Sequence, residues 1–296
     1  MQRRMLGLTA IALGLTTMLT LAAGAGARAD GAEGSQVLRK ASKVTVLAAL
    51  RASEEVPPST GAEAARGGFL ATVKWTGDGA EFTWRLAFRD LTGPAIAAHI
   101  HVAPRGEAGE IVVPLCAPCT NNQRGLAEMD VGTISAMNAG RAYVNIHTAR
   151  NPAGEIRGQI EVFDKLATTL TVGQEIPRPR GTSRKTKGGF TVTIRRSFRG
   201  TTFRWRLEWF ALTGRPIAAH VHVGARGKAG RVIISICGAA PRDRCINERG
   251  GSIRLSPAQA QALENGNIYV NLHTKRNPAG EVRGQLRAAR LTLRTS

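Results

Sequence analysis

The sequence lacks the motifs that mark several large enzyme classes. It has no Gly-x-Ser-x-Gly nucleophile turn and no glycine-rich loop of the phosphate-binding kind. It also has no nucleophilic cysteine with a catalytic partner residue that is reproduced in both halves of the chain. A His/Glu pair can do acid–base work, but nothing in the sequence positions a nucleophile or a substrate beside one. We therefore expect a binding protein rather than an enzyme.

Long apolar runs are also scarce. The one candidate is residues 5–23, which follow Met1-Gln2-Arg3-Arg4 and precede Ala25-Gly26-Ala27-Arg28-Ala29. A basic start, an apolar middle and a small-x-small end predict a secretory signal peptide over 1–29, with an uncleaved anchor as the alternative. A loose leader is expected over 30–42. No later stretch reaches the ~20 apolar residues that a membrane span needs. The mature chain is therefore expected to be exported, whether to periplasm, envelope or medium.

Acidic residues are few: 21 Asp and Glu face 41 Lys and Arg, for a net charge of +20. The imbalance is local, because residues 43–161 hold 11 cations and 12 anions (−1), whereas residues 165–296 hold 25 and 6 (+19). This asymmetry predicts that the second half contacts an anionic envelope polymer, glycan or lipid surface. The alternative is an arginine-rich composition without a partner, and no specific nucleic acid is expected. The predicted contact residues are Arg178, Arg180, Arg184, Lys185 and Lys187.

Only four cysteines occur, two in each half. Cys116-x-x-Cys119 resembles a redox or metal motif, but Cys237 and Cys245 are separated by seven residues, and a redox motif does not survive that insertion. We predict one local disulfide per half, Cys116–Cys119 and Cys237–Cys245, in agreement with an oxidising compartment.

Repetition is what the chain has in abundance. AAHIHVAPRGEAGEIVVPLC (97–116) returns as AAHVHVGARGKAGRVIISIC, and YVNIHTARNPAGEIRGQI (143–160) returns as YVNLHTKRNPAGEVRGQL (269–286). Each copy takes about 120 residues, the size of an ordinary domain. We predict two tandem domains, 43–164 and 165–296, joined by a very short linker. The oligomeric state stays open.

Short alternating segments separated by Gly/Pro turns predict an all-β fold, with an antiparallel β-sandwich or barrel in each domain. The segments expected in the first domain are 44–50, 68–75, 81–88, 97–103, 110–115, 143–148 and 155–163. Each domain is also expected to contain one short helix. The second starts at Ser256-Pro257 and stops at Asn265-Gly266, and its weaker counterpart spans 133–138.

All six histidines lie in the repeats. Residues two apart on a strand share a face, so His99 and His101 point the same way. Asn-Pro-Ala-Gly is a turn former that folds 143–148 back on 155–160 and places Asn145, His147, Glu155, Arg157 and Gln159 on one polar face. The second copy provides His220, His222, His273, Asn271, Glu281, Arg283 and Gln285.

Two interpretations of this constellation stay open. Three converging imidazoles can bind Zn or Cu, with Glu155 as a fourth ligand or as the acceptor that fixes a histidine tautomer. Alternatively, the same side chains form a buried hydrogen-bonded network that fixes strand register.

These motifs resemble a tandem pair of chordin (CHRD) domains. The matching residues are Glu54-Glu55-Val56-Pro57-Pro58, Ala97-Ala98-His99-Ile100-His101, Tyr143–Thr148 and Pro152–Gln159, with second-copy counterparts at Gln174–Pro177, His220–His222 and Tyr269–Gln285. The resemblance implies an all-β extracellular module, found in chordin and in exported microbial proteins, and no settled activity for the microbial members. Chordin's cysteine-rich repeats are missing, so nothing supports growth-factor binding. Taken together, the sequence predicts an exported non-enzymatic binding protein, with a Cu or Zn protein as the alternative.

Overall fold

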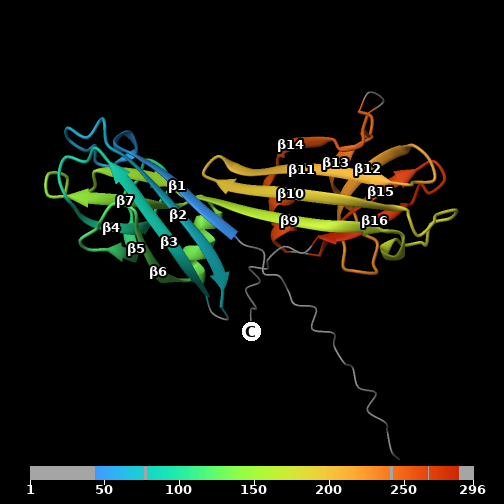
Figure 1. Cartoon of the computed structure of the whole chain (residues 1–296), viewed down its shortest axis with the longest axis horizontal. Helices are drawn as coiled ribbons and strands as arrows, with labels where there is room; N and C mark the ends of the chain where they lie inside the picture. Colours follow the sequence, from blue (N-terminus) through green and yellow to red (C-terminus); the bar gives the residue numbers. More distant parts are fainter. Residues whose placement is uncertain (1–43, 77–78, 241–242, 266, 287–296) are drawn as a thin grey trace, which may run out of the picture. The chain divides into compact units, whose positions relative to one another are not determined.

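The computed structural model describes residues 44–76, 79–240, 243–265 and 267–286 (Figure 1). The predicted signal peptide, the predicted leader, Gly266 of the predicted helix stop and residues 287–296 lie outside this part.

The predicted all-β fold is confirmed, and the strands of the first domain form two layers. One layer has the order β6-β3-β2-β1 and the other β8-β7-β4-β5, with β1 meeting β8 where Arg51 pairs with Arg157. The strands are β1 (Val44–Arg51), β2 (Arg66–Trp75), β3 (Gly79–Arg89), β4 (Ala95–Val102), β5 (Glu110–Cys116), β6 (Gln123–Asp130), β7 (Ala142–Thr148) and β8 (Ile156–Gln159).

The second domain repeats this arrangement, with layers β14-β11-β10-β9 and β16-β15-β12-β13. Its strands are β9 (Glu161–Thr171), β10 (Lys187–Ser197), β11 (Gly200–Phe210), β12 (Pro216–Val223), β13 (Val232–Cys237), β14 (Gly250–Arg254), β15 (Ile268–Thr274) and β16 (Val282–Leu286).

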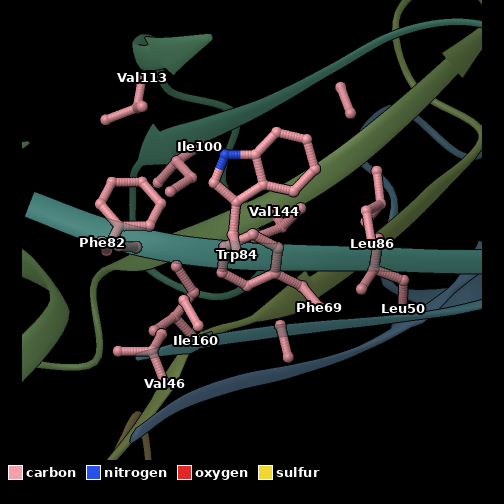
Figure 2. Close-up of a cluster of buried hydrophobic side chains, with 14 of the residues drawn as sticks. Val46, Leu50, Phe69, Phe82, Trp84, Leu86, Ile100, Val113, Val144 and Ile160 are labelled. Carbon is pink, nitrogen blue, oxygen red and sulfur yellow. The ribbon is translucent and has the colours of Figure 1, made fainter. Parts of the chain in front are cut away.

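Side-chain alternation builds a core between the layers of each domain. Val44, Val46, Ala48 and Leu50 of β1 are buried, whereas the residues between them are partly or fully exposed. In the first domain they meet aromatic residues of β2 and β3 and aliphatic residues of β4 and β7 (Figure 2). A separate cluster forms the second core. Strand β7 is buried at every position because its other face is covered too. That second face carries the histidine site.

The join between the domains is a strand, not a linker. A single strand was expected over 155–163, but the chain breaks at Ile160, which is buried and whose N–H donates to Ala142 O as the chain crosses between layers. Strand β9 then begins at Glu161. Its first residues pair with β1 and almost its whole length pairs with β10, so it crosses the predicted boundary at residue 165 without interruption.

The helices follow their capping signals. Helix α2 (Pro257–Glu264) begins after Ser256, whose side chain forms a capping box with Gln259, as the Ser-Pro signal indicates. Helix α1 (Val131–Asn138) starts two residues earlier than expected, because Asp130 caps it by accepting the Thr133 N–H at 2.7 Å.

Strands β6 and β14 were not expected from the sequence, since they are polar and largely exposed edge strands. Each contains a glycine against a tryptophan: a Cβ at Gly125 would lie 2.4 Å from Trp84 Cζ2, and one at Gly251 would lie 2.3 Å from Trp205 Cζ2. Pairing with β3 and β11, rather than their own hydrophobic pattern, makes these segments strands.

The predicted disulfides are both present, Cys116–Cys119 and Cys237–Cys245. They are consistent with an oxidising compartment. Among the described residues, no helix has the length and apolar character needed to cross a membrane.

Candidate metal centre

Strand register brings the three histidines of each repeat together. On β4 and β7, His99 is paired with Asn145, His101 with Tyr143, and Ala97 with His147, so all three imidazoles lie on the face opposite the core. His99 Nδ1 is 3.1 Å from His147 Nε2. One ring nitrogen from each of the three histidines lies within 4.8 Å of the other two. A group of three imidazole nitrogens this close together could hold a metal ion.

The second domain reproduces this geometry with His220, His222 and His273. His220 Nδ1 is 3.2 Å from His273 Nε2, and the three nitrogens again lie within 4.8 Å of one another. Ring centroids of the paired and lone histidines are 5.0 and 6.3 Å apart, against 4.9 and 6.3 Å in the first domain. The arrangement is therefore a property of the repeated unit.

Backbone carbonyls fix the tautomers of two histidines in each domain. His101 Nδ1 bonds to Gly109 O at 2.8 Å and His147 Nδ1 bonds to Pro152 O at 3.0 Å. A carbonyl only accepts, so we assign the ring proton to Nδ1, which leaves the Nε2 lone pair directed at the cluster. The equivalent acceptors in the second domain are Gly230 O and Pro278 O.

Burial keeps these imidazoles neutral. It lowers the pKa of His99 and of His220 to about 4, with a further lowering from the neighbouring histidines of each cluster. Burial also lowers the pKa of His101, His147, His222 and His273, against the hydrogen bonds to the backbone carbonyls. A neutral imidazole is the form that binds a metal, so the site does not need to lose protons at neutral pH.

An aromatic stack supports the His101 ring. Tyr143 is stacked on it with 4.8 Å between centroids and 8° between planes, and the Arg157 guanidinium lies 3.4 Å from the Tyr143 centroid on the ring face. Arg157 is 1% exposed and donates to Glu107 O and Pro104 O, while Gln159 donates to Ala103 O. These bonds hold the loop that carries Gly109 over the site. His222, Tyr269 and Arg283 form the same stack.

Glu155 lies in a different network from the one the sequence suggested. Its carboxylate accepts hydrogen bonds from the Thr92 N–H and hydroxyl, the Thr148 hydroxyl and the Asn151 amide. Burial alone would raise its pKa, but these hydrogen bonds together lower it. With its oxygens engaged, Glu155 is neither in the histidine group nor the acceptor that fixes a tautomer. Glu281 is held in the same way by Thr213, Thr274 and Asn277.

A second glutamate, which the sequence analysis did not single out as a site residue, lies beside the cluster. Glu55 follows the 3-10 turn η1 (Ala52–Glu54) and Glu175 follows η2 (Val172–Gln174), and both are buried. Burial raises the pKa of Glu55 to about 8 and that of Glu175 to about 7, although Arg157 and Arg283 oppose the shift. The repeated Glu-x-Pro of both copies is the sequence signal that could have identified them.

Unpartnered buried polar atoms collect at this site. Within the described residues, six of the nine such side-chain atoms are three matched pairs from the two domains: His101 and His222 Nε2, Asn145 and Asn271 Oδ1, Glu55 Oε1 and Glu175 Oε2. The Asn271 amide is close enough to influence the pKa of both His222 and Glu175, yet its oxygen lacks a donor in hydrogen-bond geometry. Buried polar atoms without partners are costly. A cation bound there would accept the lone pairs of His101 Nε2 and Asn145 Oδ1.

The predicted polyanion residues are not members of the histidine cluster, but Arg180 lies against the turn that holds His273: its N–H donates to Asn277 Oδ1 at 2.7 Å. Arg178, Arg180, Arg184, Lys185 and Lys187 are all exposed, along the segment that leads into β10. None of them forms an ion pair within the described part of the chain. We call these five residues the basic loop.

The fold and the site together define a tandem all-β module with a histidine cluster in each unit. The CHRD domain family model matches residues 46–160 and again 166–286, which together make up most of the chain. The chain therefore belongs to the CHRD domain family, as its motifs indicated, and carries two tandem copies. Comparison with curated proteins and with solved structures gave no match.

Proposed function

We propose that the chain is an exported binding protein in which each CHRD domain holds one zinc or copper ion through its three histidines. The observation that carries this proposal is the convergence of three imidazole nitrogens within 4.8 Å in both domains. Imidazole is a preferred ligand of both metals, and histidine ligands commonly donate their second N–H to a carbonyl. Unpartnered His101 Nε2 and Asn145 Oδ1 fit the same role, because a cation accepts lone pairs from both.

Export is supported by the amino-terminal sequence pattern and by the two disulfides. Edman sequencing of the mature protein from its native source should start near residue 30. A chain that retains residues 5–23 would contradict the cleaved signal peptide.

Metal loading tests the main proposal. Protein purified without a histidine tag, stripped with chelator and then loaded with Zn(II) or Cu(II), should hold one ion per domain by elemental analysis. All six histidines of the sequence belong to the two clusters, so no other histidine adds to the signal. His101→Gln should remove one ion and His101→Gln/His222→Gln both. Less than one ion per chain for both metals in the wild type would overturn the proposal.

A second function is favoured by charge: the second domain binds an anionic polymer or surface through the basic loop. The five cations are exposed and without acidic partners in the described part, and the second half carries +19 against −1 for the first. Such attraction is screened beyond ~10 Å at about 0.1 M salt.

Binding of the whole chain to acidic glycans and to anionic vesicles should therefore weaken steeply between about 0.05 and 0.5 M salt. Replacing the basic-loop residues by serine should weaken it several-fold at low salt, whereas removing Arg66, Arg89 and Lys74 from the first domain should have little effect. Retention that is independent of salt would contradict this function.

A further inference from the structure

One outer sheet face of the second domain carries cations and hydroxyls in regular rows. Pairing across β9, β10, β11 and β14 aligns Lys165, Thr193, Arg204 and Ser252 in one row. The row on one side consists of Ala167, Thr191, Arg206 and Gly250. The row on the other side consists of Phe163, Arg195, Thr202 and Arg254. These residues alternate along their strands with buried ones such as Leu166 and Val192, so they share the solvent side. We call these three rows the basic face.

The basic face is hollowed. A cleft of about 910 Å³ opens on it, and its lining includes Lys165, Thr191, Thr193, Arg204, Arg206 and Ser252. Within the described residues, Lys165 and Arg204 have no ion-pair partner, and Arg206 reaches only the exposed Glu248 at 3.2 Å. Lys165 and Arg204 are therefore available to a ligand.

The corresponding sheet face of the first domain carries different residues. There the row equivalent to that of Lys165 is Thr45, Thr72, Thr83 and Leu126. The row equivalent to that of Ala167 is Leu47, Leu70, Arg85 and Arg124. Leu47, Leu70 and Leu126 are 37%, 44% and 67% exposed. At their positions the second domain has Ala167, Thr191 and Ser252, and it has Lys165 and Arg204 in place of Thr45 and Thr83. The fold is duplicated, but on this face two exposed leucines are replaced by hydroxyl residues, the third by alanine, and two threonines by cations.

The chemistry of the face selects among anionic partners. Strands lie ~4.8 Å apart and same-face residues ~6.8 Å apart along each strand, so cations alternate with hydroxyls at the scale of a sugar ring. Guanidinium and ammonium groups bind carboxylate or sulfate, and hydroxyls bind sugar hydroxyls. The three exposed leucines that could anchor in lipid are replaced on this face. The aromatic residue of the rows, Phe163, has the Arg195 guanidinium 5.9 Å from its ring centroid, and Trp205, which also lines the cleft, packs against the core of the second domain. Both rings are therefore already engaged by protein groups, which disfavours stacking of nucleobases.

We infer that the basic face is the binding site for an acidic polysaccharide, with Lys165 and Arg204 contacting its carboxylate or sulfate groups and Thr191, Thr193 and Ser252 contacting its hydroxyls. This inference rests on the proposed anionic partner and adds to the basic loop a second contact site and a ligand class. It differs from the basic loop, which lies at the Lys187 end of β10.

The test exchanges residues between the two domains. Lys165→Thr/Arg204→Thr installs the first-domain residues and keeps the fold of the sheet. The matched control, Arg226→Thr/Lys228→Thr, removes the same charge from an exposed loop elsewhere in the second domain. Binding of the full chain to heparin and to polygalacturonate is measured by titration at fixed salt, and the two probes separate sulfate from carboxylate recognition.

We expect the exchange variant to weaken binding of at least one probe about ten-fold or more and the control variant less than three-fold. Equal weakening by both variants, or loss only when the basic loop is changed, would overturn the inference while leaving the anionic partner in place. Anionic phosphatidylglycerol vesicles or DNA bound more tightly than either polysaccharide would also overturn it. No binding of any polyanion by the wild type would overturn both this inference and the proposed anionic partner.

Discussion

Glu155→Ala is expected to destabilise the protein by about 3 to 5 kcal/mol in urea unfolding. The carboxylate is 0% exposed and receives hydrogen bonds from Thr92, Thr148 and Asn151. Asn151 in turn binds the backbone of Thr60, so one side chain joins three loops. Its removal leaves several buried donors without an acceptor, and each such group costs about 1 to 3 kcal/mol.

Two variants give this measurement its controls. Glu155→Gln keeps the shape but turns an amide donor toward existing donors, so its cost should be intermediate. Glu63→Ala, at an exposed position, should change the free energy of unfolding by about 0.5 kcal/mol or less. A loss below about 1 kcal/mol for Glu155→Ala would refute the structural role assigned to this carboxylate.

The Glu155→Ala variant should also affect metal binding at the histidine site of the first domain. Glu155 closes the turn that contains Pro152, and Pro152 O holds His147 Nδ1 at 3.0 Å. When the turn loosens, the lone pair of His147 loses its fixed direction, and metal affinity in the first domain should fall while the second domain keeps its ion. Elemental analysis of Glu155→Ala checks this directly, provided that the measurement is made well below the unfolding midpoint.

The gathering of the histidines could be predicted because it depends on two local rules. A strand has period two, which puts His99 and His101 on one face. Asn-Pro-Ala-Gly makes a tight hairpin, which pairs Asn145 with Arg157 and leaves His147 at the turn end of the same face. Both rules act over a few residues and recur in each copy. The sequence left open only whether β4 and β7 are neighbours, and the register between Ala97 and His147 shows that they are.

Other parts of the site depend on contacts between distant segments. Glu55 reaches the cluster from a turn some 90 residues before the hairpin, and no periodicity links it to Asn145. Glu155 was assigned to the histidines because of its place in the hairpin, but Thr92, on the loop after β3, takes up its carboxylate. Strands β6 and β14 were missed for the same reason, since a polar edge strand is defined by its neighbour.

Lowering the pH from 7 to 4 is expected to destabilise the metal-free protein through its histidines. In the folded state burial lowers the pKa of all six, to about 4 for His99 and His220, whereas the unfolded chain has values near 6.5. The unfolded state therefore binds more protons between about pH 6.5 and 4, and stability is lost as the pH falls through this window.

The buried carboxyl groups affect the pH dependence of stability in two different ways. Glu55 and Glu175, with pKa values raised by burial to about 8 and 7, favour the fold as the pH falls, and this gain is complete by about pH 4.5. Glu155 and Glu281 have lowered pKa values, so they add to acid destabilisation only below their ordinary range. Between pH 6 and 4.5 the histidines and the two raised glutamates therefore oppose each other, and the histidine contribution is a loss of stability.

The opposing glutamates are common to the wild type and to a histidine variant, so the difference between the two proteins isolates the loss of stability that the histidines cause. Urea midpoints of the metal-free wild type and of His101→Gln/His222→Gln should be compared at each pH. The variant replaces two titrating rings by neutral amides, so its midpoint should fall less. Curves for the two proteins that run parallel from pH 7 to 4.5 would mean that these imidazoles are solvated in the folded chain. Burial could then no longer explain why the imidazoles are neutral and able to bind a metal ion at neutral pH.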